Sequence, residues 1–292
     1  MTADPIAETL AEALQLERTG EPEAALACFD AALANQSEAL LLHSNRGLLL
    51  ERMQRYEDAL ESFQAATRIE GNFRDHYNAG NMLLFLERNA EAKDAFDASI
   101  ACRDDYPEAW VNRGIASNGI DATTTARESF EQALAINEAF YPALRCLAIL
   151  EASLENETAA IEYYERAAKA QPQLASAWFE LGCALYKTLG EGQVFFEPAG
   201  PEGRTIQAFD KVIELDPQTQ GAWGRKIGTL FRLSDAAQAT DRAAAGANAD
   251  APPMLPLIHA ELTSTIDAAI QRFPDDPWFA DRRRDAEAML ER

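Results

Sequence analysis

Histidine and cysteine are the side chains best suited to catalysis or metal binding, and this 292-residue chain contains few of either. The histidines are His43, His76 and His259, and the cysteines are Cys28, Cys102, Cys146 and Cys183. The cysteines form no C-x-x-C pair, and the sequence contains no G-x-S-x-G or H-E-x-x-H motif. His43 and His76 are far apart along the chain, and their spacing does not suggest a shared metal site. We therefore expect no enzyme activity, no catalytic residue and neither a metal nor another cofactor.

Asparagine suggests a different chemistry, because three asparagines recur at a nearly constant interval. They are Asn45, Asn78 and Asn112. An amide side chain carries both a donor and an acceptor, as a polypeptide backbone does at each residue. Each hydrogen bond contributes about 0.5–1.5 kcal/mol net, whereas micromolar affinity needs about 8 kcal/mol. A row of three amides could therefore bind extended backbone only with the help of further anchoring side chains.

The same interval runs through small and aromatic residues, which indicates an internal repeat of about 34 residues. Glycines recur at Gly47, Gly80, Gly114 and Gly182, and aromatic residues recur at Phe29, Phe63, Phe96, Phe130 and Tyr164. The pattern predicts two antiparallel helices per unit, with small residues where the helices approach each other. We expect the aromatic ring to fill the gap toward the next unit. One unit cannot bury its own apolar face, so the units must stack.

This pattern resembles the tetratricopeptide repeat family, in which Trp110 and Trp178 would occupy one conserved slot that His43 and His76 fill elsewhere. The resemblance implies an all-α fold, a right-handed α-solenoid of helix-turn-helix repeats with C-terminal capping helices. The expected repeats are 6–39, 40–72, 73–106, 107–140, 141–174, 175–219 and 220–246. His43 and His76 are then expected to be packing residues.

Two irregularities interrupt the period. The interval from Trp178 to Trp223 exceeds one repeat by about 11 residues, so we expect an insertion loop over residues 188–203. The loop contains Phe195 and Phe196, which either cover apolar surface on their own repeat or contact a ligand. Residues 247–292 are expected to form a linker and C-terminal capping helices, which leaves a repeat domain over residues 1–246.

The resemblance also implies where a partner would bind, because helix A of each repeat lines the groove in this family. Asn45, Asn78 and Asn112 fall on one groove position, and their row looks like the asparagine ladder of the tetratricopeptide domain of O-GlcNAc transferase. The other expected groove residues are Tyr77, Asn81, Arg74, Arg145, Phe179 and Arg225, and Phe85 also falls on a groove position. The alternative is that the asparagines belong to the family consensus and serve packing.

Charge limits the class of partner. The formal net charge is −22, and such a field repels nucleic acids and anionic membrane surfaces. No stretch approaches 18 apolar residues, and the N-terminus lacks the features of a signal peptide, so we expect a cytoplasmic protein. The sequence therefore favours a non-catalytic adaptor that binds an extended peptide or a helix of a protein partner. The alternatives are a self-associating scaffold and a regulatory subunit that binds a small ligand under the 190–203 loop.

Overall fold

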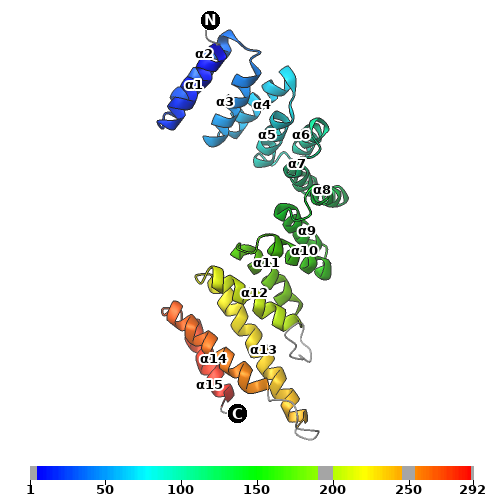
Figure 1. Ribbon diagram of the computed structural model, residues 1–292, viewed down its shortest axis with the longest axis vertical. Helices are drawn as coiled ribbons and strands as arrows, with labels where there is room; N and C mark the ends of the chain where they lie inside the picture. Colours follow the sequence, from blue (N-terminus) through cyan, green and yellow to red (C-terminus); the bar gives the residue numbers. More distant parts are fainter. Residues whose placement is uncertain (1–4, 190–199, 245–253, 291–292) are drawn as a thin grey trace. The chain divides into compact units, whose positions relative to one another are not determined.

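A computed structural model describes residues 5–189, 200–244 and 254–290, and within these ranges the chain is helical with no strand (Figure 1). The helices are α1 (Pro5–Arg18), α2 (Pro22–Asn35), α3 (Leu40–Arg52), α4 (Tyr56–Glu70), α5 (Phe73–Phe85), α6 (Asn89–Cys102), α7 (Pro107–Asn118), α8 (Thr123–Ile136), α9 (Tyr141–Ser153), α10 (Glu157–Ala170), α11 (Ala175–Thr188), α12 (Pro201–Leu215), α13 (Gln220–Ala244), α14 (Met254–Arg272) and α15 (Pro277–Leu290). The expected all-α fold of stacked helix-turn-helix repeats is confirmed.

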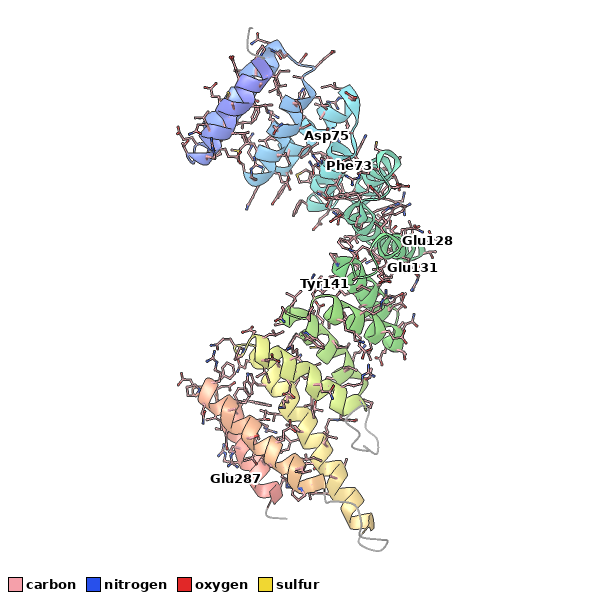
Figure 2. All side chains as sticks on the ribbon, viewed as in Figure 1. Phe73, Asp75, Glu128, Glu131, Tyr141 and Glu287 are labelled. Carbon is pink, nitrogen blue, oxygen red and sulfur yellow. The ribbon has the colours of Figure 1, made fainter. Side chains whose placement is uncertain are left out.

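The chain divides into two compact units, which we call unit 1 (residues 1–146) and unit 2 (residues 147–292). Unit 1 contains the helix pairs α1–α2, α3–α4, α5–α6 and α7–α8. We call the first helix of each pair the A helix, and α1 also contacts the A helix α3, as α5 contacts α7. The second helix, the B helix, lies behind this layer. Figure 2 shows Glu128 and Glu131 on the side of the B helix α8 that points away from α7.

Within the pairs α3–α4, α5–α6 and α7–α8, a glycine on the A helix lies against an aromatic ring on the B helix. A Cβ atom built on Gly47 would lie 2.7 Å from Cε1 of Phe63, and the same distance separates Gly80 from Phe96. Phe63 and Phe96 are fully buried. Each ring therefore packs on the glycine of its own pair, and its packing toward the next repeat stays a prediction.

The same contact tests the proposed insertion. Gly47 contacts Phe63 on the following helix, but Gly182 contacts Phe209, which is considerably farther along the chain from its glycine. The additional residues therefore leave the packing of α11 on α12 unchanged. The loop is shorter than the expected 188–203, because α11 ends at Thr188 and α12 begins at Pro201. Phe195 and Phe196 lie outside the described residues.

The helices α13 and α14 are longer than the helices of the repeats before them. The expected seventh repeat, 220–246, corresponds to a single helix, α13, which packs against α14. The two late helices expected from the sequence are found as α14 and α15. The division of the chain into a repeat domain and a capping segment at residue 246 stays a prediction.

A second recurring contact fixes the start of the A helices. The indole nitrogens of Trp110, Trp178 and Trp223 donate to the carbonyl oxygen six residues earlier, at 2.8–3.0 Å. His43 occupies the same slot, and its Nε2 lies 2.8 Å from the Ser37 carbonyl oxygen. The side chain at this position therefore anchors the connection from the preceding B helix, which agrees with the packing role expected for His43.

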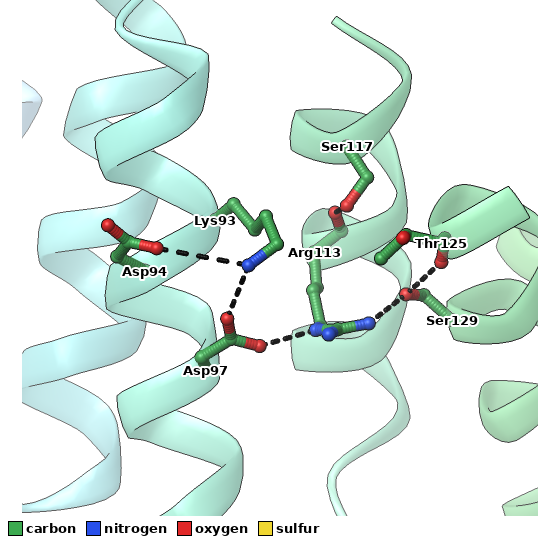
Figure 3. A network of polar contacts seen from close by, with 7 residues as sticks. All are labelled: Lys93, Asp94, Asp97, Arg113, Ser117, Thr125 and Ser129. Carbon is green, nitrogen blue, oxygen red and sulfur yellow. Dashed lines mark hydrogen bonds and ion pairs between the residues drawn. The ribbon is translucent and has the colours of Figure 1, made fainter. Parts of the chain in front are cut away.

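Neighbouring repeats of unit 1 are joined by an arginine that links three helices (Figure 3). Nε of Arg113 on α7 donates to Asp97 on α6, and its Nη1 donates to Oγ of Ser129 on α8 at 2.6 Å. Burial opposes ionisation of Asp97, but Arg113 and Lys93 outweigh it and lower the pKa of its carboxyl group. The carboxylate is therefore ionised at neutral pH.

An equivalent network occurs two repeats earlier in the chain. Arg46 donates from Nε to Asp30 at 2.7 Å and from Nη1 to Ser62 at 2.6 Å. We call the two sets the Arg46 network and the Arg113 network. Each crosses from the B helix of one repeat to both helices of the next, so the contacts between repeats recur with a period of two repeats in this part of unit 1.

The glycine–phenylalanine contact gives a stability prediction. Gly47→Ala is expected to destabilise the protein by about 1–3 kcal/mol, because the added methyl group overlaps the Phe63 ring in a packed core. Combining it with Phe63→Leu should cost less than the sum of the two single changes, because the smaller side chain frees the space. Urea denaturation followed by circular dichroism measures both effects.

Gly224→Ala in α13 is the control for this experiment. Its Cβ atom would lie 3.8 Å from Trp278, an ordinary contact, so the change should raise stability by about 0.5–1 kcal/mol through helix propensity. Equal stability of wild type and Gly47→Ala would show that the helices can separate to admit the methyl group, against the constraint described here.

Candidate functional site

Three of the expected groove residues form one hydrogen-bonded cluster between the A helices α5 and α7 of unit 1. Nδ2 of Asn112 on α7 donates to Oδ1 of Asn81 at 2.8 Å and to the hydroxyl of Tyr77 at 3.2 Å, both on α5. All three side chains are half-buried. The contact uses both hydrogens of the Asn112 amide. The other polar atoms of the two amides are Oδ1 of Asn112, an acceptor, and Nδ2 of Asn81, a donor.

Aromatic packing holds Tyr77 in place. Its ring centroid lies 5.8 Å from that of Phe96 and 5.2 Å from that of Tyr106, in an edge-to-face arrangement with the latter. Burial raises the pKa of Tyr77, so its hydroxyl stays protonated at neutral pH. Because Phe96 is the ring that packs on Gly80, the cluster is connected directly to the core of its own repeat.

The three asparagines do not behave as one row. Asn45 donates from Nδ2 to the Leu41 carbonyl oxygen of its own helix at 2.7 Å, a local bond of the i to i−4 type. Asn78 is half-buried on α5. Only Asn112 has a hydrogen bond to a neighbouring A helix among the side-chain bonds described for these three residues. The spacing of the three asparagines therefore predicts that they share one repeat position, but it does not predict that their side-chain contacts differ.

The A helices of unit 1 also carry exposed apolar side chains. Leu41 is 55% exposed, Phe85 59% and Ile115 42%, and each belongs to a different A helix of unit 1. The Phe85 ring stacks on Tyr56 with a centroid distance of 4.7 Å, so it is held in one orientation. We call the surface formed by the cluster, Leu41, Phe85 and Ile115 the A-helix face of unit 1. Leu41 and Ile115 were not among the expected site residues. The sequence does contain a signal for them, because they occupy the same repeat positions as expected polar groove residues.

Two expected arginines also belong to unit 1. Arg74 is exposed on α5, and its guanidinium carbon lies 5.5 Å from the centre of the Phe73 ring. Figure 2 labels Phe73 next to Asp75 at the start of α5. Burial raises the pKa of Asp75, which accepts a hydrogen bond from Ser44 at 2.7 Å. Arg145 is half-buried on α9. The role of either arginine in binding stays a prediction.

The remaining expected residues form a separate cluster in unit 2. The guanidinium carbon of Arg225 on α13 lies 5.3 Å from the ring centre of Phe179 on α11. The Phe179 ring also packs edge-to-face on Phe209, at 6.1 Å between centroids. Arg225 donates to the Gly221 carbonyl oxygen of its own helix at 3.4 Å. These contacts involve the core ring of the sixth repeat, so Phe179 and Arg225 are at least partly packing residues.

The described residues, 5–189, 200–244 and 254–290, offer little for other kinds of site. No group of three or more His, Cys, Asp or Glu side chains in these ranges is arranged to hold a metal ion. No helix in the described part of the chain is both long and apolar enough to span a membrane. Burial raises the pKa of the Cys183 thiol, which makes it a poor nucleophile at neutral pH.

Comparisons with known proteins agree with this architecture. Two family profiles described as tetratricopeptide repeat match residues 10–72 and 147–174. An uncharacterised TPR repeat-containing protein of Arabidopsis thaliana is 29% identical over 122 residues, which is 39% of this chain and 15% of that protein. The chain thus matches a small part of the length of this relative.

Solved structures show the same fold at low sequence identity. The C-terminal part of a TPR repeat-containing protein from Cytophaga hutchinsonii superposes with a TM-score of 0.66 at 11% identity, covering 93% of this chain and 98% of that one. PilW, described as a type IV pilus biogenesis factor, gives a TM-score of 0.59 at 21% identity, with 75% of this chain and 96% of that chain covered.

The stacked helix pairs and these matches define an α-helical repeat protein, a class whose extended surfaces serve protein–protein interaction and scaffolding. Within that class, residues 10–72 and 147–174 match tetratricopeptide repeat models, and the described helices have the fold of solved tetratricopeptide repeat proteins.

The different contacts of two asparagines give a second stability prediction. Asn112→Ala is expected to destabilise the protein by about 1 kcal/mol, because Tyr77 and Asn81 lose their common donor. Asn45→Ala should be neutral or stabilising by up to about 0.5 kcal/mol, because alanine favours the helix and only a local bond is lost. Chemical denaturation of the two variants checks this difference, and equal losses would contradict the distinct roles.

Proposed function

We propose that the protein is a non-catalytic adaptor whose A-helix face in unit 1 binds an extended segment of a partner protein. The observation that carries this proposal is the cluster of Asn112, Asn81 and Tyr77, on A helices that also carry exposed apolar side chains. The cluster is preorganised, because its members hold one another and Tyr77 is packed on Phe96. Little side-chain entropy remains to be lost when a ligand binds.

The polar part of the site matches an extended backbone. Oδ1 of Asn112 can accept from a peptide N–H, and Nδ2 of Asn81 can donate to a peptide C=O. The two atoms belong to amides joined by a 2.8 Å hydrogen bond, so they address one peptide unit or two consecutive ones. Such contacts fix the direction and register of a bound segment without reading its sequence.

The apolar part of the site supplies the affinity that the amides lack. Two or three hydrogen bonds contribute a few kcal/mol, which falls short of micromolar binding. Burial of a large apolar side chain contributes about 1.5–3 kcal/mol, and aromatic residues are frequent hot spots. Phe85 on α5, held by Tyr56, and Ile115 on α7 can therefore act as anchors. We infer a ligand with apolar side chains at intervals along an extended backbone.

The net charge of the chain restricts the partner further. A formal charge of −22 disfavours nucleic acids and anionic membranes and favours basic or neutral segments. Arg74, exposed at the edge of α5, adds a local positive charge that can meet an acidic side chain or a terminal carboxylate.

Selection of peptides from a random phage-displayed library against the full chain tests this proposal. The selected peptides are synthesised with a fluorescent label, and their dissociation constants are measured by anisotropy. Asn112→Ala is expected to weaken binding at least fivefold, and Phe85→Ala or Ile115→Ala about tenfold, because anchors dominate the affinity.

Ile136→Ala on α8 is the matched control. Ile136 is 41% exposed, compared with 42% for Ile115, but it belongs to a B helix, so its removal should leave the dissociation constant within twofold of wild type. The proposal fails if no peptide is enriched above background, or if Ile136→Ala weakens binding as much as Ile115→Ala does.

A further inference from the structure

A cavity on the B-helix side of unit 1 lies outside the proposed peptide site. Its volume is about 660 Å³, and its walls come from α2, α3, α4 and the connection between α2 and α3. Three carboxylates line it, those of Asp30, Glu38 and Glu61, together with the apolar side chains of Leu33 and Ile69. Arg46, at the centre of the Arg46 network, forms part of the wall.

The protein contains a second copy of this constellation in the same unit. Two repeats further along the chain, the positions of Asp30, Glu38 and Glu61 correspond to those of Asp97, Asp105 and Glu128. Leu33 and Ile69 likewise become Ile100 and Ile136, and Arg46 becomes Arg113. The copies can therefore be compared position by position, as two structures of one site would be.

The second copy contains a lysine where the first has none. Nζ of Lys93 donates to Oδ2 of Asp97 at 2.7 Å, while Oδ1 of the same carboxylate accepts from Arg113 (Figure 3). In the first copy, Oδ1 of Asp30 accepts from Arg46, but the residue that corresponds to Lys93 is Leu26, which is buried. The Asp97 carboxylate is thus paired with two cationic side chains, whereas the contacts described for Asp30 pair its carboxylate with one.

The slot next to this carboxylate is also more open in the first copy. Trp110 occupies it in the second copy, with the Arg113 guanidinium carbon 5.8 Å from the centre of the indole ring system. The equivalent residue in the first copy is His43, which lines the cavity and has a smaller ring. The first copy therefore has a smaller ring in this slot and pairs only one oxygen of the Asp30 carboxylate with a cation of the chain.

We propose that this cavity binds a lysine side chain from a basic segment of a partner protein. Its ammonium group would donate to Oδ2 of Asp30, as Lys93 donates to Asp97, within the field of Glu38 and Glu61. The aliphatic part of the lysine would lie along Leu33 and Ile69, as long cationic side chains commonly do on apolar surface. The strongly negative chain attracts such a segment from a distance.

Arg68 is a third difference between the copies, and its substitution tests whether charge in the cavity controls the binding of a lysine side chain. It lines the cavity, whereas the equivalent residue in the second copy is Ala135. Its positive charge opposes a bound lysine, so Arg68→Ala is expected to strengthen binding about twofold to fivefold.

Titration with hexalysine at physiological salt tests the proposal on the full chain. The first readout is the Nε–Hε NMR signal of the two arginines. The Arg46 signal should shift, because its acceptor Asp30 gains a second cation. The Arg113 signal should stay in place, because Lys93 already occupies Asp97. Equal shifts of both signals, or no shift of Arg46, would overturn the proposal.

The second readout is the affinity for fluorescein-labelled hexalysine, with a matched pair of triple variants. Asp30→Asn, Glu38→Gln and Glu61→Gln together should weaken binding at least fivefold. The control changes Asp97→Asn, Asp105→Asn and Glu128→Gln, which removes the same charge from the second copy and opens the same kind of arginine network. It should change the affinity less than twofold. Equal losses in the two variants would mean that hexalysine responds to total charge, and the site would be rejected.

The double variant Lys93→Leu, Trp110→His completes the comparison, because it gives the second copy both residues of the first. It should make the Arg113 signal respond to hexalysine, as Arg46 does in the wild type. An Arg113 signal that stays insensitive would show that the oxygen freed from Lys93 does not bind an external ammonium group, against the proposal. Circular dichroism of each variant shows whether its helices are retained.

Discussion

The close contact between an A-helix glycine and a B-helix phenylalanine is the constraint on which the repeats depend. A side chain at Gly47 or Gly80 would overlap a fully buried ring, so the two helices of a pair can lie at only one separation and register. Every other feature of a repeat follows from that register: the slot that carries His43 or Trp110, the arginine that reaches the preceding B helix, and the side of the A helix that stays exposed. The longer stretch of chain between Gly182 and Phe209 shows that the constraint survives an insertion between the two helices.

The two candidate surfaces of unit 1 depend on this packing in different ways. On the A-helix face, Phe96 packs on Gly80 and on Tyr77, so the core of the repeat orients the hydroxyl to which Asn112 donates. On the other side, the arginine networks position carboxylates between successive B helices. A partner with an apolar extended segment and a basic segment could engage both surfaces, and the gain in affinity would depend on the length of chain between the segments.

The fold could be predicted from the sequence because the repeat places the same physical requirement at the same position many times. Gly, Phe and Trp recur at fixed intervals, and each contact that they make is local to one pair. The site could be predicted only in part. The spacing of Asn45, Asn78 and Asn112 is nearly constant, yet their partners differ, because Asn112 faces Tyr77 and Asn81 while Asn45 faces its own helix. Such differences depend on the side chains of the neighbouring repeat. A pattern at one repeat position carries no information about those side chains. The loop with Phe195 and Phe196 lies outside the described residues, so its role stays a prediction.

The arginine networks also define how this part of the chain could change in length. Asp30, Arg46 and Ser62 recur as Asp97, Arg113 and Ser129, whereas the repeat between them has Ala79 at the arginine position. Loss of the single repeat 73–106 would bring Arg113 opposite Gln64, and a half-buried guanidinium would lose its carboxylate. Loss or gain of two repeats together would join matching surfaces. The unit that duplication or recombination can transfer here is therefore the pair of repeats, which is a larger module than the one that the sequence period defines.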